Sequence, residues 1–282
     1  MTITAADVKK LRDETDAPMM DCKAALTEAG GDFERAKQIL REKGKAQAAK
    51  KADRATQEGI ARFYVSADGK TAAGVIVECE TDFVSGNDTF KALVDTLGKG
   101  FLARGEAGAT VVIDGASVDE RITDAVNTIR ENIQLRHAEL YKTENAFGAY
   151  NHHTGKSAAL VELSGTASNL KEVGDQLATQ VIGMRAMYTN KEDIPADLIA
   201  AELQTQINRA IEEGKPANIA ENIAKGRVEK EFYREAVLLE QDYFADTKKK
   251  VSGYVTEEAA KGGGTITVKG FVKLVVGQSS AE

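Results

Sequence analysis

One pattern occurs twice in this chain: two strand-like stretches joined by a turn and followed by a helix-like stretch. In the first copy, residues 60–65 and 72–79 are rich in strand-forming side chains and flank an Asp68-Gly69 turn signal. In the second, residues 146–150 and 158–163 precede a helical pattern from Leu170 to Met187. The fold class that we expect is therefore α+β, with two similar core subdomains built on antiparallel sheets.

The remaining patterns set the limits of these subdomains. Residues 90–97 and 122–140 show helical periodicity and belong to the first subdomain, expected over residues 59–143. A last strand-like stretch, residues 265–276, is expected to complete the second sheet. The second subdomain then consists of two segments, residues 144–196 and 242–282.

Residues 197–241 interrupt the second subdomain with two helical segments. Gly214-Lys215-Pro216 joins them, and glycine commonly ends one helix while proline begins the next. The apolar positions of both segments form a narrow stripe, which is enough for a helical pair but not for a full core. We expect an inserted antiparallel helical hairpin that projects from the body with few contacts.

The N-terminal residues read as a separate helical module. Apolar spacing predicts three short helices within residues 1–44, with Asp32 capping the third helix and Gly44 following it. Residues 45–58 contain good helix formers but almost no large apolar side chain, so they are interpreted as a linker or a solvated helix.

Composition restricts the class of partner. Hydrophobic residues make up 42% and charged residues 29%, the balance of an ordinary globular protein. The net charge of -7 argues against nucleic acid, and no apolar run approaches the length of about 20 residues that spans a membrane. Two cysteines are too few for a disulfide framework or a zinc site. A cytoplasmic protein without a cofactor is expected.

Residue patterns for enzyme chemistry are weak. Residues 154–157 (Thr-Gly-Lys-Ser) resemble part of a phosphate loop, but Tyr150 stands where that motif needs glycine, so a hairpin turn is favoured. His152 and His153 are adjacent in an expected extended segment, where their side chains would point to opposite sides. No catalytic residue and no metal site are assigned, and an enzyme built on these histidines and Lys156 is the least favoured function.

Three stretches resemble the elongation factor Ts family in order and spacing. They are residues 8–26, the sequence Glu80-Thr81-Asp82-Phe83-Val84, and Tyr150-Asn151-His152. The resemblance, which extends from about residue 3 to the end, implies a three-helix module like the ubiquitin-associated (UBA) domain, two α+β core subdomains and a protruding antiparallel coiled-coil hairpin.

The resemblance also implies a function: binding to the GTPase elongation factor Tu, dislodging its Mg²⁺ and promoting GDP release. Thr81, Asp82, Phe83 and Val84 would displace the Mg²⁺, with Phe83 as a wedge. Other residues would contact the partner, and they are Arg12, Met19, Met20, Lys23, Ile129, Asn132 and His152. A homodimer or a 2:2 complex is possible.

Alternatives remain at several of these positions. Without the resemblance, Phe83 is best interpreted as a core aromatic at the start of the next helix. One of Met19 and Met20 would pack inward, because adjacent helical positions lie about 100° apart. For the whole chain, the alternative function is a UBA-like protein-binding adaptor without exchange activity.

Two stretches depart from the family pattern. Arg130 precedes Glu131-Asn132-Ile133 where the family usually has glycine, which puts the close approach at that position in doubt. Residues 181–185 also differ from the family's usual helix sequence, and no contacts are assigned there.

Overall fold

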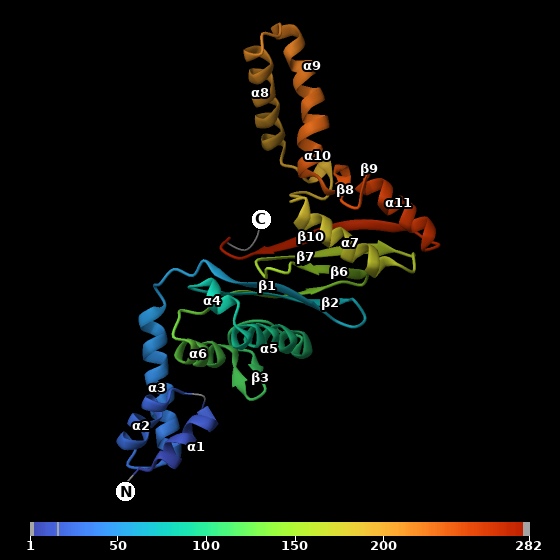
Figure 1. Cartoon of the computed structure of the whole chain (residues 1–282). Coiled ribbons are helices and arrows are strands. Elements are labelled where there is room, and N and C mark those ends of the chain that lie inside the picture. The colour runs from blue at the N-terminus through green and yellow to red at the C-terminus, as the bar shows by residue number, and fades with distance from the viewer. Residues whose placement is uncertain (1–2, 16, 279–282) are drawn as a thin grey trace.

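Two three-stranded antiparallel sheets stack face to face in the middle of the molecule, and helices cover their outer faces (Figure 1). The first sheet has the order β1 (Glu58–Val65), β2 (Thr71–Cys79), β5 (Gln134–Lys142). The second has the order β10 (Ile266–Val275), β7 (Ser157–Gly165), β6 (Ala146–Asn151). The structure is a computed structural model that describes residues 3–15 and 17–278. It confirms the α+β class.

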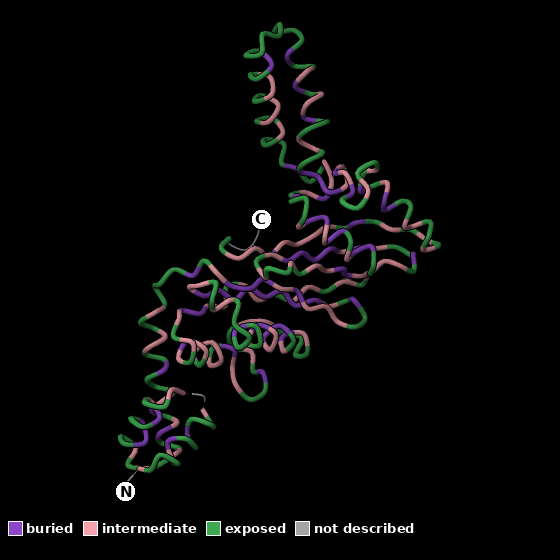
Figure 2. Tube along the Cα trace, viewed as in Figure 1, coloured by how far each residue is buried: buried purple, intermediate pink, exposed green. Residues whose placement is uncertain are grey.

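Alternation along the central strands divides the apolar residues between two layers. On β2, Ala72 and Ile76 pack against the second sheet, whereas Val75 and Val77 pack against helices α5 (Asp88–Arg104) and α6 (Val118–Ile129). The second sheet is covered in the same way by α7 (Leu170–Gly183) and α11 (Val251–Lys261). Both central strands are therefore buried on both faces, as the tube in Figure 2 shows.

The helix expected over residues 122–140 is wrong in its second half. Helix α6 ends at Ile129, and residues 134–142 form β5, which pairs with β2. Arg130 takes a left-handed conformation with φ 72°, which ends the helix. The pairing shifts register opposite Ile76 and Val77, leaving Arg136 as an extra residue on β5. This bulge disturbs the alternation by which a strand is recognised.

The third N-terminal helix is longer than expected. Helices α1 (Ala5–Thr15) and α2 (Met19–Glu28) are followed by α3 (Phe33–Lys51), which continues through Gly44. A Cβ on Gly44 would lie 2.2 Å from Asn127 Nδ2 of α6. Gly44 therefore does not end the helix; it lets α3 pack closely against α6.

Several short elements have no counterpart in the expected patterns. They are α4 (Asp82–Ser85), the hairpin β3 (Val112–Ile113) and β4 (Ala116–Ser117), the 3-10 helix Lys191–Asp193, and β8 (Asp242–Tyr243) with β9 (Asp246–Lys250). Helix α11 was also not expected, and α7 stops at Gly183 rather than Met187. Over residues 3–15 and 17–278, no helix has the length and apolar character to cross a membrane.

Helices α8 (Ala196–Glu212) and α9 (Ala217–Arg227) form a hairpin that projects from the sheets (Figure 1). A π-helical turn (Val228–Phe232), α10 (Tyr233–Ala236) and the 3-10 helix Leu238–Glu240 return the chain to the body. The seam between the two long helices buries only small side chains completely, those of Ala210, Ala220 and Ala224. In the described chain, the four apolar core clusters include no residue of α8 or α9.

We expect the body to fold without this hairpin. The two segments of chain at the base of the hairpin are hydrogen-bonded to each other. Tyr188 N donates to Ala236 O at 3.0 Å, and Leu238 N donates to Tyr188 O at 2.8 Å. Replacing residues 197–232 with a short glycine-serine linker should change the free energy of unfolding by less than about 1 kcal/mol. Urea unfolding followed by circular dichroism tests this, and loss of the cooperative transition would contradict it.

Candidate functional site

The Thr-Asp-Phe-Val sequence forms a one-turn helix directly after β2. Thr81 is extended, and its Oγ1 accepts a hydrogen bond from Val84 N at 3.4 Å, which caps α4. Val84 is half-buried against the cluster beneath the first sheet, whereas Phe83 is 87% exposed. The core-aromatic interpretation of Phe83 is therefore wrong. Residues 81–86 are termed the Phe83 turn below.

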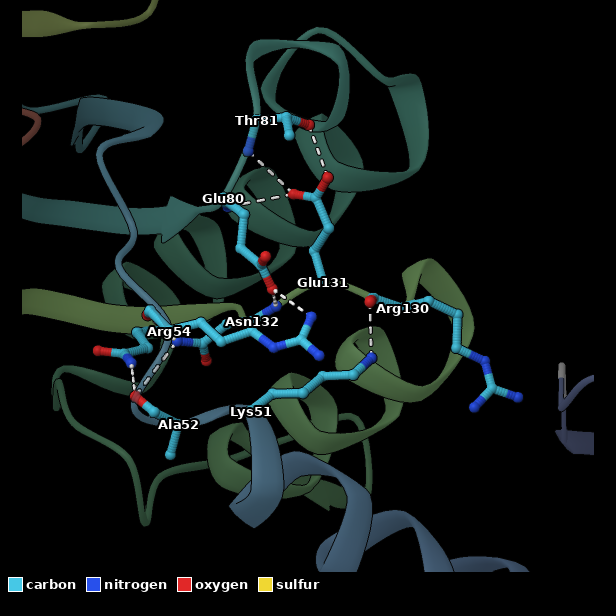
Figure 3. A network of polar contacts seen from close by, with 9 residues as sticks. Lys51, Ala52, Arg54, Glu80, Thr81, Arg130, Glu131 and Asn132 are labelled. Carbon is cyan, nitrogen blue, oxygen red and sulfur yellow. Dashed lines mark hydrogen bonds and ion pairs between the residues drawn. The ribbon is translucent and has the colours of Figure 1, made fainter.

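A reciprocal pair of glutamates holds the Phe83 turn to the loop before β5 (Figure 3). Glu131 Oε2 accepts hydrogen bonds from Glu80 N at 3.1 Å and Thr81 N at 3.0 Å, and its Oε1 accepts from Thr81 Oγ1 at 2.6 Å. In return, Glu80 Oε1 accepts from Asn132 N at 2.6 Å. Hydrogen bonds to a carboxylate are stronger than neutral ones, so this clamp fixes the start of α4.

The sheet topology brings the clamp together. Strands β2 and β5 are antiparallel, and Glu78 near the end of β2 pairs with Gln134 at the start of β5. Residues that follow β2 therefore lie beside residues that precede β5. The buried carboxylate of Glu78 adds a further tie, because it accepts from Thr56 Oγ1 at 2.9 Å and from Arg136 Nε at 2.8 Å.

The Asn132 side chain makes its hydrogen bonds inside the molecule. It is 2% exposed, and its Nδ2 donates to Arg54 O at 2.7 Å and Ala52 O at 3.3 Å (Figure 3). Asn132 thereby holds the segment that connects α3 to β1. The contact of Asn132 with a partner protein that the resemblance implies stays a prediction. Ile129 is half-buried at the end of α6 and packs on the cluster beneath the first sheet.

Cys79 supports the Phe83 turn from below. Its Sγ donates to Thr81 O at 3.3 Å. Burial, together with the nearby Glu131 carboxylate, raises the pKa of the Cys79 thiol to about 12. A thiol with such a pKa stays protonated at neutral pH, so Cys79 packs and donates but is a poor nucleophile.

The four candidate residues of the N-terminal module all lie on its surface. Arg12 is exposed on α1 and Lys23 on α2, while Met19 is 45% and Met20 71% exposed. The expectation that one methionine packs inward is wrong, because Cys22, Ala25 and Leu26 form the inner face of α2. Met19, Met20 and Lys23 are termed the methionine face.

His152 lies in the turn between β6 and β7. Its Nδ1 is 2.7 Å from Thr154 Oγ1, and its ring centroid is 4.2 Å from that of His153. The expectation that the two histidines point to opposite sides is wrong, because β6 ends at Asn151 and residues 152–156 turn back into β7. The hairpin-turn interpretation of residues 154–157 is confirmed, and Gly155 takes φ 75° there.

The His152 turn and the Phe83 turn lie at the same end of the stacked sheets. Lys156 Nζ is 2.9 Å from Glu58 Oε2, and Glu58 is the β1 residue that pairs with Cys79. Gly155 O also accepts a hydrogen bond from Ala61 N at 2.7 Å. The fold thus brings two motifs about seventy positions apart in sequence to one end of the sheets, as Figure 1 shows for β1 and α4.

Glu80 and Glu131 are functional candidates that sequence reasoning missed. Both stand in motifs that were recognised, but neither received a role. The signal that could have found them is the β5 strand, because pairing residues 134–142 with β2 brings these two acidic residues to three backbone N–H groups, those of Glu80, Thr81 and Asn132.

Comparisons with known proteins show the family of this chain. Residues 80–278 match the family model described as Elongation factor TS. The chain is 41% identical to an Elongation factor Ts from Symbiobacterium thermophilum, over 98% of this chain and 92% of that protein. It is 37% identical to one from Aquifex aeolicus, over 98% and 99%, and 40% identical to one from Bordetella petrii, over 98% and 92%.

The matched range begins at Glu80, beyond the three N-terminal helices. An adaptor function that depends on those helices alone is therefore not favoured. The family model covers more than half of the chain, and the relatives match it over nearly their whole lengths. The chain therefore belongs to the elongation factor Ts family and is a translation elongation factor.

Proposed function

We propose that this chain binds the GDP-bound form of elongation factor Tu and accelerates GDP release by presenting Phe83 as a wedge. The observation that carries the proposal is the 87% exposure of Phe83 on a turn fixed by the Glu131 carboxylate. A large aromatic side chain on a rigid support loses little conformational entropy when it enters a pocket on a partner. Such side chains are typical binding hot spots.

Asp82 gives the wedge its effect on the nucleotide. It is exposed in the first turn of α4, next to Phe83. Mg²⁺ in GTPases requires near-octahedral oxygen coordination and bridges the protein to the phosphates. A carboxylate brought near that ion disturbs its shell of oxygen ligands, and loss of the ion weakens the hold on GDP. The residues of this chain therefore bind and displace, and no covalent step is needed.

Two further surfaces extend the proposed interface. The methionine face offers flexible apolar side chains beside charge, which suits docking onto a protein groove. His152 is half-exposed at the same end of the sheets as Phe83, and we propose that it meets a second part of the partner. Arg12 and the exposed part of Ile129 are assigned to the same interface. The proposed complex is cytoplasmic and involves neither nucleic acid nor membrane, and the chain takes part in it as a homodimer or in a 2:2 complex.

The finer architecture is proposed on the same basis. We infer that α1–α3 form a UBA-like module and that α8 and α9 form a coiled coil. Core subdomains N (residues 59–143) and C (residues 144–196 and 242–282) are proposed as the two structural repeats. The similar layering of a three-stranded sheet and its helices in both halves supports this division.

The test is release of a fluorescent GDP analogue from elongation factor Tu, with and without stoichiometric factor. Release should accelerate strongly when Mg²⁺ is present. In excess EDTA the ion is already absent, so the additional acceleration by the factor should shrink. No acceleration at stoichiometric factor would disprove the exchange function, and equal acceleration in both buffers would disprove the Mg²⁺ step.

A further inference from the structure

Arg130 connects the N-terminal module to the core at a position where arginine is unusual. It is the residue after α6, with φ 72° and ψ 13°. This left-handed region is natural for glycine and unfavourable for a side chain with a Cβ. A non-glycine residue that persists there needs contacts that compensate, and the Arg130 side chain makes them.

Those contacts reach two helices of the module. Arg130 Nη2 lies 2.5 Å from Asp21 Oδ2 on α2, and its Nη1 donates to the side chain of Gln47 on α3. The carbonyl oxygen of Arg130 accepts a hydrogen bond from Lys51 Nζ at 2.6 Å, at the end of α3 (Figure 3). One residue of the core thus holds α2 and the C-terminal end of α3.

The Arg130 contacts bridge a cleft between module and core. The cleft has a volume of about 1000 Å³, and Asp21, Gln47 and Ile129 are among its lining residues. Helix α3 packs against α6, with Gly44 against Asn127. Residues of α2, α3, α5 and α6 line the cleft, and Asp21 of α2 forms the ion pair with Arg130.

Asp21 and Glu131 connect this bridge to the two proposed docking surfaces. Asp21 stands directly after Met20 on α2, so its partner orients the methionine face. Glu131 follows Arg130 and holds the Phe83 turn. Two neighbouring residues of one loop therefore fix two proposed docking surfaces that lie far apart in sequence.

We propose that Arg130 is a positioning residue that sets the orientation of the methionine face relative to Phe83, so that the partner meets both surfaces in a preset arrangement. This inference rests on the proposed exchange function. A preset arrangement raises the effective concentration of the second contact once the first has formed. It acts on binding and leaves the exchange step, which Phe83 performs, unchanged.

The test compares Arg130→Gly with the wild-type chain. Glycine fits the left-handed conformation, so the variant keeps the fold and loses only the bridge. Because the Arg130 and Asp21 side chains are 43% and 40% exposed, we expect a moderate effect: the half-saturating factor concentration in the GDP-release assay should rise about two- to fivefold, at an unchanged maximum rate. Exchanging the charges, Arg130→Asp with Asp21→Arg, should restore part of the loss.

A second readout does not depend on the partner. Spin labels on cysteines introduced at the exposed positions Lys9 on α1 and Lys99 on α5 report the distance between module and core, and the native Cys22 and Cys79 are fully buried. The distance distribution should be narrow in the wild type and broader in Arg130→Gly. An unchanged distribution overturns the inference, as does a broader distribution with an unchanged half-saturating concentration. If the wild-type chain did not accelerate GDP release from elongation factor Tu, the exchange function would be disproved instead. The spin-label distances would still decide whether Arg130 orients the module.

Discussion

Replacing Phe83 with alanine is expected to slow factor-catalysed GDP release by about ten- to a hundredfold, because the wedge carries the coupling between factor binding and nucleotide loss. The same change should alter the free energy of unfolding by less than about 0.5 kcal/mol, since Phe83 is 87% exposed and little of its surface is buried in the free chain. Parallel nucleotide-release and urea-unfolding experiments measure both effects.

The matched control is Phe90→Ala, seven positions along the chain. Phe90 is completely buried in the cluster between the first sheet and α5, so its truncation should cost about 3 to 5 kcal/mol of stability. Exchange per folded molecule should stay close to that of the wild type. If Phe83→Ala instead lost stability like Phe90→Ala and kept normal exchange per folded molecule, the wedge function of Phe83 would be wrong.

The parts of the fold that the sequence predicted are those with local signals. The hairpin of β1 and β2 carries a turn signal between two alternating or continuously apolar stretches, and the structure has it over nearly the expected residues. The α8–α9 hairpin is marked by Gly214 and Pro216 at its tip. Each of these signals depends only on neighbouring residues, which is why single-sequence reasoning can find them.

Strand β5 shows where that reasoning fails. Residues 134–140 fall within the stretch from Ile122 to Leu140 whose periodicity predicts a helix. A bulge at Arg136 places Leu135 and Ala138, three positions apart, on the same face of the sheet. The bulge exists only because β5 pairs with β2 about sixty positions earlier. A strand whose periodicity depends on a distant partner cannot be distinguished from a helix locally.

The surroundings of the candidate-site residues are difficult to predict for the same reason. The resemblance implies a partner contact for Asn132 but says nothing of its internal role, in which its amide holds the segment after α3. Met19 and Met20 were expected to divide between core and surface, yet smaller side chains on α2 fill the inner face. Whether a polar or flexible side chain faces inward is decided by tertiary packing, and motif matching reports only that the position matters.

Glu131→Ala is expected to have a second large effect on exchange, because Glu131 holds the Phe83 turn in place. Glu131 itself is not part of the wedge. Alanine removes the acceptor of three hydrogen bonds, from Glu80 N, Thr81 N and Thr81 Oγ1. Hydrogen bonds to a charged group contribute about 1.5 to 3 kcal/mol, so a stability loss of that size is expected.

Maximal GDP release per folded molecule should fall about ten- to a hundredfold in Glu131→Ala, because a displacement of the wedge by about 1 Å is enough to cost that much. Thr81→Val removes one of the three donors and should give a smaller loss. A double-mutant cycle between the two changes should then show coupling in both stability and exchange, since both act on the same contact.

Glu120→Ala is the matched control for Glu131→Ala. Glu120 also accepts hydrogen bonds from a backbone N–H and a hydroxyl, those of Ser117, but it caps the start of α6 and does not touch the Phe83 turn. Its loss should cost about 1 kcal/mol of stability and leave exchange per folded molecule unchanged. If Glu131→Ala behaved like Glu120→Ala in exchange, the turn would keep Phe83 in place without the clamp, and Glu131 would stabilise the fold without positioning the wedge.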